Sequence, residues 1–426
     1  MQNEGGPPAT PPKGTGVTLT VRVGDAPAAG APVFLHDEAG TTTGQLQTNA
    51  DGVASAPVAP KQLTVLVGTG PITYTDVEEG DTLLLDIPAD PSLPPPPPIG
   101  TLSVTIQGKD GVTSGLAAMA GNCMGSGDTA GVPFDVLLYP RCVNASKTTV
   151  LAIAYGGNRG IMYQLAHDVA VPAAGQTKSI GFAGDGNWNE DTNLAVIKLT
   201  GAAKSATSEL DFFYGGVRIG MGLVRGGSVT SEYGEQYPIP GRPRDTLVGV
   251  AFEHSGQTSS HSFMAKREIL GTGVDTTGDF SHTFSVSDAL APVTEATTTL
   301  VGDRFQIKAT MQNAKAAAIA IAQVRWPSSF EGMPEGKWTF IMNPEKGAWT
   351  SPAPPAGFPG PAPNAELSTA VGYFDSSHVQ SFVDAKKLPL DPTGRYLREP
   401  HLADTSIGPG TKVGTVRYSM AGDLVP

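Results

Sequence analysis

Charged side chains are scarce in this chain, and basic ones are the scarcer kind. Asp, Glu, Lys and Arg together make up 16% of the 426 residues, with 28 basic against 40 acidic. The formal net charge of −12 opposes binding to the phosphate backbone of nucleic acids and to anionic membrane surfaces. We therefore expect no nucleic acid among the partners of this protein.

Long hydrophobic runs are also missing. No stretch of about 18 or more apolar residues occurs, so we expect no direct membrane span. The start MQNEGGPPATPPKG lacks the basic and apolar regions of a signal peptide, so an exported protein would already have lost its leader. The polar, Gly- and Pro-rich residues 1–14 predict a disordered tether.

Cysteine is nearly absent. Cys123 and Cys142 lie nineteen positions apart, and neither has a second Cys or a His at the spacing of a zinc site. An isolated pair in a β-rich chain of small residues predicts a disulfide between them and hence an exported protein. The alternative is two buried free thiols in a cytosolic protein.

Motifs of nucleophilic or metal-dependent catalysis are missing as well. The chain has no GxSxG or HExxH motif, and no base stands beside either cysteine. The seven histidines are scattered, and only His254 and His261 could face each other across a predicted turn. We expect no enzyme; the open alternative is a secreted enzyme whose site gathers Asp185, Asp191, His254 and His261.

What the chain does have is the pattern of β-strands. Thr, Ser, Gly and Val are abundant, and VTLTVRV at 17–23 and LTVLV at 63–67 alternate apolar residues with a period of two. Residues 311–326 are rich in Ala, but AIAIAQVRW within them alternates too, so Ile319, Ile321 and Gln323 should line one strand face. The fold class is therefore all-β, with tandem β-sandwich domains.

The segment GDAPAAGAPVFLHDEAGTTTGQLQTNADGVASAPV (24–58) contains a Gly30–Val33 strand entry and a Thr48–Gly52 turn. With these features it resembles the carboxypeptidase-regulatory-like, prealbumin-like domains of exported bacterial proteins. The resemblance implies a non-catalytic, seven-stranded sandwich that serves as a spacer or as a binding or folding support. It covers residues 15–90.

Five consecutive prolines follow at 94–98. A polyproline rod has no backbone donors for a sheet, so we interpret residues 91–100 as a stiff linker that holds domains apart. A ligand for a proline-reading groove is the alternative. Beyond the linker, a strand, a polar turn and a second strand recur from Thr148, Asp245 and Leu367, which predicts sandwiches at 101–203, 204–292 and 293–426, the last with a proline-rich insert at 350–363.

Two groups of side chains are candidate ligand sites. Asp185, Asn187, Asn189 and Asp191 alternate in GFAGDGNWNEDTNL and offer oxygen ligands for calcium, the only cofactor we expect; a polar loop with Asx turns is the alternative. Trp326, Trp338 and Trp349 gather near the C-terminal end, where they form either a platform for stacking on sugars or part of a sandwich core.

Together these patterns predict a non-enzymatic extracellular or cell-surface protein, adhesive or structural, that presents binding loops on tandem β-sandwiches. Its partner would be a glycan or a protein on a surface. The tether and the modular build loosely resemble uncharacterised bacterial surface lipoproteins, which implies an outer-surface location and a lipid anchor lost from the N-terminus. The alternative is a carbohydrate-binding accessory part of a secreted hydrolase system.

Overall fold

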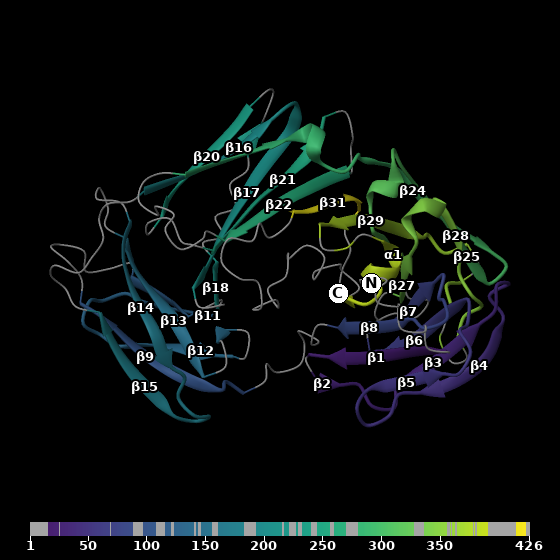
Figure 1. Cartoon of the computed structure of the whole chain (residues 1–426), viewed down its shortest axis with the longest axis horizontal. Helices are drawn as coiled ribbons and strands as arrows, with labels where there is room; N and C mark the ends of the chain where they lie inside the picture. The colour runs from purple at the N-terminus through teal and green to yellow at the C-terminus, as the bar shows by residue number, and fades with distance from the viewer. Residues whose placement is uncertain are drawn as a thin grey trace, which may run out of the picture. The chain divides into compact units, whose positions relative to one another are not determined.

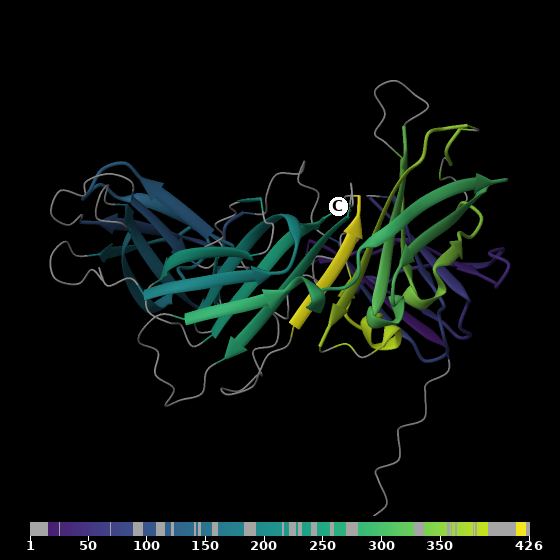
Figure 2. The same ribbon diagram turned by 90° about the horizontal axis from the view of Figure 1, so that it is seen from above.

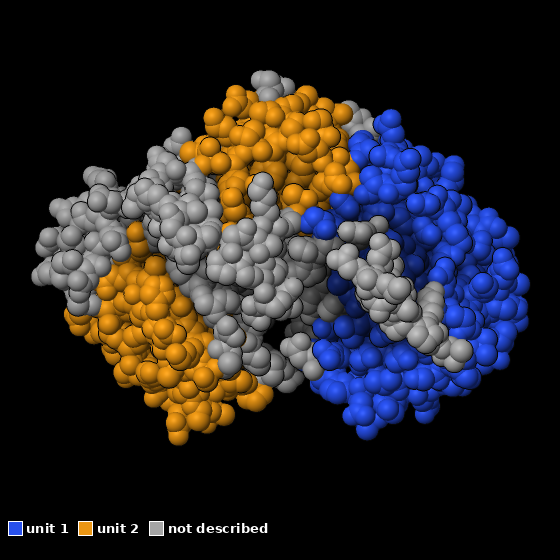
Figure 3. All heavy atoms as spheres, in the orientation of Figure 1, with its two compact units in different colours: residues 1–90, 291–398, 419–426 blue, residues 91–290, 399–418 orange. Residues whose placement is uncertain are grey.

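The chain folds into two compact units (Figure 3). Unit 1 comprises residues 1–90, 291–398 and 419–426, and unit 2 comprises residues 91–290 and 399–418. The computed structural model describes residues 16–24, 26–68, 70–87, 97–107, 116–120, 123–139, 142–143, 146–155, 161–182, 193–214, 217–220, 227–228, 232–239, 245–255, 260–269, 280–327, 336–355, 358, 360–362, 364–377, 379, 381–390 and 415–422.

Both units are built from β-sheets, which confirms the predicted fold class of tandem all-β sandwiches. The one α-helix among the described residues is the single turn α1 (Phe382–Ala385), and three short 3₁₀ turns accompany the strands. In the described part of the chain, no helix reaches the length and apolarity that crossing a membrane demands.

Unit 1 combines strands from both ends of the chain. One sheet has the order β2, β1, β8, β30, with β5 also paired to β1. Its strands are β1 (Val17–Val23), β2 (Ala26–Pro27), β5 (Val53–Ala56), β8 (Thr82–Ile87) and β30 (Pro389–Leu390).

A second row of strands in unit 1 has the order β31, β29, β26, β27, β7, β6, β3, β4. The chain passes from unit 2 to unit 1 for the last time inside β31. The strands are β3 (Pro32–His36), β4 (Thr42–Gln47), β6 (Gln62–Val67), β7 (Gly70–Thr75), β26 (Ile319–Trp326), β27 (Gly336–Met342), β29 (Ser368–Ser376) and β31 (Thr415–Ala421).

A three-stranded sheet completes unit 1, in the order β24, β25, β28. Two 3₁₀ turns, at Ala314–Ala316 and Pro344–Lys346, lie in the connections of this part of the chain. The strands are β24 (Val293–Val301), β25 (Arg304–Met311) and β28 (Ala348–Thr350).

The N-terminal strands do not form a domain of their own, although the linker hypothesis expects one. β7 pairs in parallel with β27, so that Ile72 lies opposite Thr339, and β8 pairs in parallel with β30. Both views show the purple N-terminal strands within the same body as the green and yellow C-terminal ones (Figures 1 and 2). The predicted division into separate sandwiches at 15–90 and 293–426 is therefore wrong. The proline segment, of which the structure describes only Pro97 and Pro98, leads from unit 1 into unit 2, and its role as a stiff linker stays a prediction.

Unit 2 contains a first sandwich made of two sheets, in the orders β11, β10, β13, β14 and β12, β9, β15. Its core takes Leu102 and Val104 from β9, Val136 from β12 and Val150 from β13, all without exposed surface. The strands are β9 (Gly100–Ile106), β10 (Leu116–Ala120), β11 (Cys123–Gly127), β12 (Phe134–Leu138), β13 (Lys147–Tyr155), β14 (Ile161–Ala170) and β15 (Thr177–Phe182).

The second sandwich of unit 2 combines the order β20, β16, β23 with the order β18, β17, β21, β22, and β19 also pairs with β17. A 3₁₀ turn at Val286–Asp288 follows its last strand. The strands are β16 (Asn193–Thr200), β17 (Ala203–Tyr214), β18 (Val217–Gly220), β19 (Gly227–Ser228), β20 (Glu232–Ile239), β21 (Asp245–His254), β22 (Ser260–Ile269) and β23 (Phe280–Ser285).

The boundary between these two sandwiches differs from the expected one at 203/204. Leu199 of β16 packs in the same core as Ala206 of β17 and Phe252 of β21. β16 therefore belongs to the second sandwich, and the first one ends at Phe182. Strand alternation marks β16 as a strand but does not say which core it faces.

The recurring hairpin is present twice among the described residues, as β13 with β14 and as β21 with β22. At the third position only the first strand, β29, forms as expected. The chain then turns into α1, where the Ser381 hydroxyl accepts a hydrogen bond from the Asp384 N–H at 3.2 Å and caps the helix. The prediction of a third hairpin is therefore wrong.

The individual strand predictions are confirmed where the alternation is strongest. Val17, Leu19 and Val21 of β1 are at most 3% exposed, and β26 begins at Ile319 as a strand. The predicted turn at 48–52 also forms: Asn49 Oδ1 accepts the N–H groups of Asp51 and Val53, and Gly52 has a φ of 73°.

Candidate functional site

The predicted disulfide is present. Cys123 and Cys142 are bonded, with their Cα atoms 5.7 Å apart, and both lie in the core of the first sandwich of unit 2. Cys123 opens β11, while Cys142 follows the end of β12, so the bond ties an edge strand to the opposite sheet. Its role in the structure is a covalent staple.

The three tryptophans do not form an exposed platform. Trp326, Trp338 and Trp349 are 4%, 1% and 7% exposed, which makes the stacking-platform hypothesis wrong and the core alternative right. Trp338 stacks on Phe340 at 5.2 Å between ring centroids. The Trp349 Nε1–H donates to the backbone carbonyl of Asn343 at 3.2 Å. The alternation in β27 places the rings of Trp338 and Phe340 on one face of the strand. That face lies in the core, because burial of aromatic surface is favourable.

The candidate calcium ligands Asp185, Asn187, Asn189 and Asp191 lie outside the described residues. Within the described part, no three side chains of His, Cys, Asp or Glu come together as a metal site would require. The calcium hypothesis therefore stays a prediction.

His254 and His261 are not a facing pair. In the β21–β22 hairpin it is Glu253 that lies opposite His261, so His254 points to the other face of the sheet. His254 Nε2 pairs with Ser262 Oγ at 2.7 Å, and the ring of His261 meets that of Tyr418 edge-on. Burial, and then the charge of His261, lower the pKa of His254. These two side chains serve structure and do not meet in a cleft.

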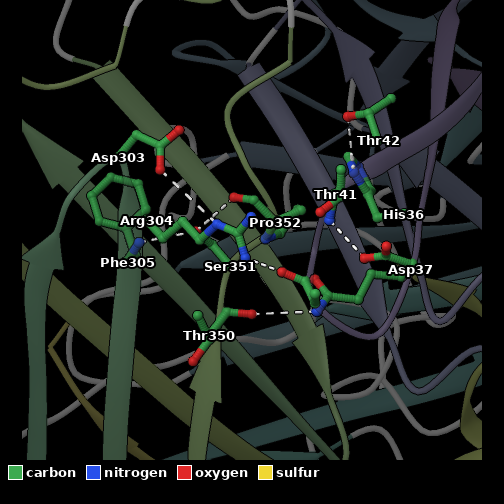
Figure 4. A network of polar contacts seen from close by, with 12 residues as sticks. His36, Asp37, Thr41, Thr42, Asp303, Arg304, Phe305, Thr350, Ser351 and Pro352 are labelled. Atoms are coloured by element: carbon green, nitrogen blue, oxygen red, sulfur yellow. Dashed lines mark hydrogen bonds and ion pairs between the residues drawn. The ribbon is translucent and has the colours of Figure 1, made fainter.

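A polar network in unit 1 connects N-terminal and C-terminal strands (Figure 4). Arg304 at the start of β25 donates to the backbone carbonyl of Ala39 in the turn between β3 and β4. The Ala353 N–H donates to the Gly40 carbonyl at 3.0 Å, and Gln62 Nε2 to the Thr350 carbonyl at 3.4 Å. These bonds attach the start of the proline-rich insert to the N-terminal strands.

His36 is the buried end of this network. Its side chain has no exposed surface; Nε2 pairs with Thr64 Oγ1 at 3.0 Å and Nδ1 with Thr42 Oγ1 at 3.3 Å. Thr64 in turn pairs with Thr73, which accepts the Trp338 Nε1–H at 2.8 Å. Burial lowers the pKa of His36 to about 4; the Arg304 charge adds to this effect and the Asp37 charge opposes it. His36 is therefore neutral near pH 7.

Neutral His36 makes the stability of unit 1 depend on pH. The folded-state pKa of about 4 lies below the ordinary value of 6.5, so the unfolded chain binds the extra proton first. We expect the free energy of unfolding to fall by up to about 3 kcal/mol as the pH drops from 6.5 to 4. Urea titrations followed by tryptophan fluorescence would measure it, because three of the four tryptophans lie in unit 1.

The matched variants are His36→Gln and His167→Gln, the second at an exposed position of unit 2. His36→Gln should remove this part of the pH dependence, and His167→Gln should keep it. An equally steep loss of stability in His36→Gln would contradict the assignment.

The proline-rich insert forms one wall of a groove in unit 1. Its volume is about 580 Å³, within the range of ligand-binding clefts. Asp303 and Asn364 are among its lining residues, and Asn364 has a φ of 69°, in the left-handed region that Asn tolerates. The groove is lined by Thr298, Thr299, Leu300, Gly302, Asp303, Pro354, Gly360, Pro361, Asn364, Ala365 and Leu367. We call it the insert groove.

A second, smaller groove of about 350 Å³ lies beside Trp349. Two of its charged groups form an ion pair with each other, Lys346 Nζ with Asp76 Oδ1. It is lined by Glu38, Lys61, Gln62, Thr75, Asp76, Lys346, Ala348, Trp349 and Thr350. The insert groove is the better candidate for a ligand, because it is the larger of the two and its one charged lining residue stays accessible. Asp303 Oδ1 lies 4.0 Å from Arg304 Nε, but the Asp303 side chain is 68% exposed.

The proline-rich insert is apparent in the sequence, whereas the roles of Asp303, Asn364, His36 and Arg304 are not. Two signals were readable. Gly302-Asp303 between two alternating runs is a two-residue hairpin turn, and an Asn after a proline-rich stretch is a common left-handed residue. The pairing of His36 with Thr64, and of Thr64 with Thr73, depends on strand order and has no local signal.

Comparison with known proteins gives structural neighbours of very low similarity. No family model matches the chain, and no curated protein matches it significantly. The FN1–FN3 domains of chicken CNTN1 align with 66% of this chain and 93% of their own, at 10% identity and a TM-score of 0.14.

Two further solved structures show the same level of similarity. The Bacillus anthracis TIE protein aligns with 64% of this chain and 50% of its own, at 11% identity and a TM-score of 0.15. A tetra-tandem repeat from the extending region of a large adhesion protein aligns with 84% and 99%, at 11% identity and a TM-score of 0.14. Scores this low carry no argument about the function of this chain, which shares with these proteins the all-β, tandem-domain class.

Proposed function

We propose that the protein is a non-enzymatic extracellular or cell-surface protein that binds a glycan in the insert groove. The observation that carries the proposal is the groove itself, where Asp303 and Asn364 line a space of about 580 Å³ next to the hydroxyls of β24. Carboxylate, amide and hydroxyl groups in a preformed cleft can exchange hydrogen bonds with sugar hydroxyls in a fixed geometry.

An extracytoplasmic location is supported by the disulfide, because such bonds persist in oxidising compartments. The resemblance of residues 24–58 to prealbumin-like modules fits the same proposal, in which these strands support the rest of unit 1. A lipid anchor and a bacterial outer surface remain part of the proposal, because the Gly- and Pro-rich residues 1–14 and the modular build resemble those of bacterial surface lipoproteins.

The carbohydrate-binding accessory role in a hydrolase system is the second candidate. This role also requires a carbohydrate ligand. The exposed tryptophan platform that would have favoured it does not exist, because Trp326, Trp338 and Trp349 are buried. It would be favoured over an adhesive role if the bound glycan were a polysaccharide that a secreted hydrolase degrades.

The proposal predicts glycan binding by the full chain that depends on the groove. We expect a hit on an array of polysaccharides and glycans. Asp303→Asn replaces a charged acceptor oxygen by an amide donor, and Asn364→Gly removes an amide, so each should weaken binding roughly tenfold. Isothermal titration calorimetry with the captured glycan would measure the dissociation constants. Gly at 364 keeps the left-handed backbone, so the loss reports the amide.

Asp135→Ala is the matched control, because Asp135 is an exposed carboxylate of β12 in unit 2. It should bind like the unaltered chain. A glycan that binds the groove variants with unchanged affinity would rule out this site, and an array without hits would rule out a glycan ligand and favour a protein partner.

A further inference from the structure

Lys386 is a lysine without access to water in unit 1. Its side chain is 1% exposed and contacts Asp81 Oδ2, and the side chain of Asp81 is 2% exposed. Lys386 Nζ also donates to the backbone carbonyl of Asp76 at 3.0 Å and lies 5.0 Å from the ring centroid of Phe382. Taking two opposite charges out of water costs much of what their attraction returns, so a plain ion pair gains little here.

The two side chains are held against each other by the backbone on both sides. Asp81 Oδ2 accepts the Glu78 N–H at 2.8 Å, and the Asp81 carbonyl accepts the Thr18 N–H at 3.0 Å. The Lys386 N–H donates to the Phe382 carbonyl at 3.1 Å at the end of α1. Reacting groups fixed in contact in this way behave as if at very high concentration, which favours a reaction that is unfavourable between free molecules.

We propose that Lys386 Nζ and Asp81 Cγ condense to an intramolecular amide. One proton passes from the Lys386 ammonium to the Asp81 carboxylate, which gives a neutral amine and a carboxylic acid. The amine electron pair then forms a bond to Cγ, the bond from Cγ to the hydroxyl oxygen breaks, and the hydroxyl leaves with an amine proton as water. No atom changes its oxidation state, and no co-reactant is consumed.

The surroundings favour this outcome. Val77, next in the chain to Asp76, is 2% exposed and Ala385, next to Lys386, is fully buried, so the chain around the pair is shielded from water as well. The amide removes both charges and retains an N–H for the hydrogen bond to the Asp76 carbonyl. The cross-link would join residues 305 positions apart, between the N-terminal and C-terminal segments of unit 1.

Mass spectrometry of the full chain tests the proposal. After reduction of the disulfide and denaturation, we expect an intact mass lower than that of the sequence by one water. A tryptic digest should contain a branched species that joins the peptides carrying Asp81 and Lys386, without cleavage after Lys386. Folding of each sample is checked by its tryptophan fluorescence.

Lys386→Met should have the full mass of its sequence. Lys346→Met is the matched control, since Lys346 also contacts an aspartate, Asp76, but is 53% exposed, and it should keep the deficit of one water. A folded wild-type chain at full mass, after prolonged incubation, would overturn the proposal. A mass deficit without the branched species would also overturn it, because the water would then come from another site. If Lys386→Met fails to fold, the wild-type digest alone decides.

Discussion

Replacing Trp338 with alanine is expected to lower the free energy of unfolding of unit 1 by about 3 to 5 kcal/mol. Trp338 is 1% exposed, stacks on Phe340 and meets the ring of Phe305 edge-on at 5.8 Å between centroids. The change removes the largest fully buried side chain and leaves a cavity that the surrounding sheets can only partly close. Urea unfolding followed by the fluorescence of the remaining tryptophans would measure the loss.

The same variant tests whether both chain segments of unit 1 unfold together. Trp338 on β27 donates its indole hydrogen bond to Thr73 on β7, so its loss should increase amide exchange in both strands. Trp338→Phe keeps a ring in the core and should cost clearly less. If Trp338→Ala changed the stability by less than about 1 kcal/mol, the burial of this side chain would not hold the unit together.

Removal of the disulfide should destabilise the first sandwich of unit 2 by about 3 kcal/mol, the chain-entropy cost for a loop of this length. The bond closes a sequence separation of 19, and both sulfur atoms lie in the core. Cys123→Ala combined with Cys142→Ala avoids leaving polar atoms there. Amide exchange of β10 and β13 at increasing denaturant would report the loss in this sandwich alone.

Exchange in the second sandwich, for instance in β21, is the internal control and should be unchanged. Reduction of the unaltered chain should reproduce the effect of the double substitution. Equal protection of β10 with and without the bond would show that the sandwich owes its stability to apolar burial alone.

The strands could be predicted from the sequence, but most of their neighbours could not. β1 and β6 were readable because their apolar residues alternate. The pairing of β7 with β27 was not, since backbone hydrogen bonds carry no side-chain signal and join residues more than 250 positions apart. For the same reason the sequence did not predict that residues 16–87 and 291–390 belong to one unit.

The site residues divide along similar lines. The disulfide could be predicted, because the chain has two cysteines and each can pair only with the other. The tryptophans were ambiguous, because alternation identifies a shared face without saying whether it is covered. Lys386 gave no signal at all: a lysine in the run DAKKL normally lies in solvent, and only the fold brings it to Asp81.

The composite make-up of unit 1 has a consequence for biosynthesis. When residues 16–87 leave the ribosome, β7 and β8 lack β27 and β30, which are made after all of residues 91–290. The edges of β7 and β8 that pair with β27 and β30 stay unpaired while some two hundred intervening residues are synthesised. Unpaired strand edges are prone to aggregation during this period. Truncations that begin near residue 100 would leave β27 and β30 without those partners, so only a chain that contains both segments can be expected to fold into unit 1.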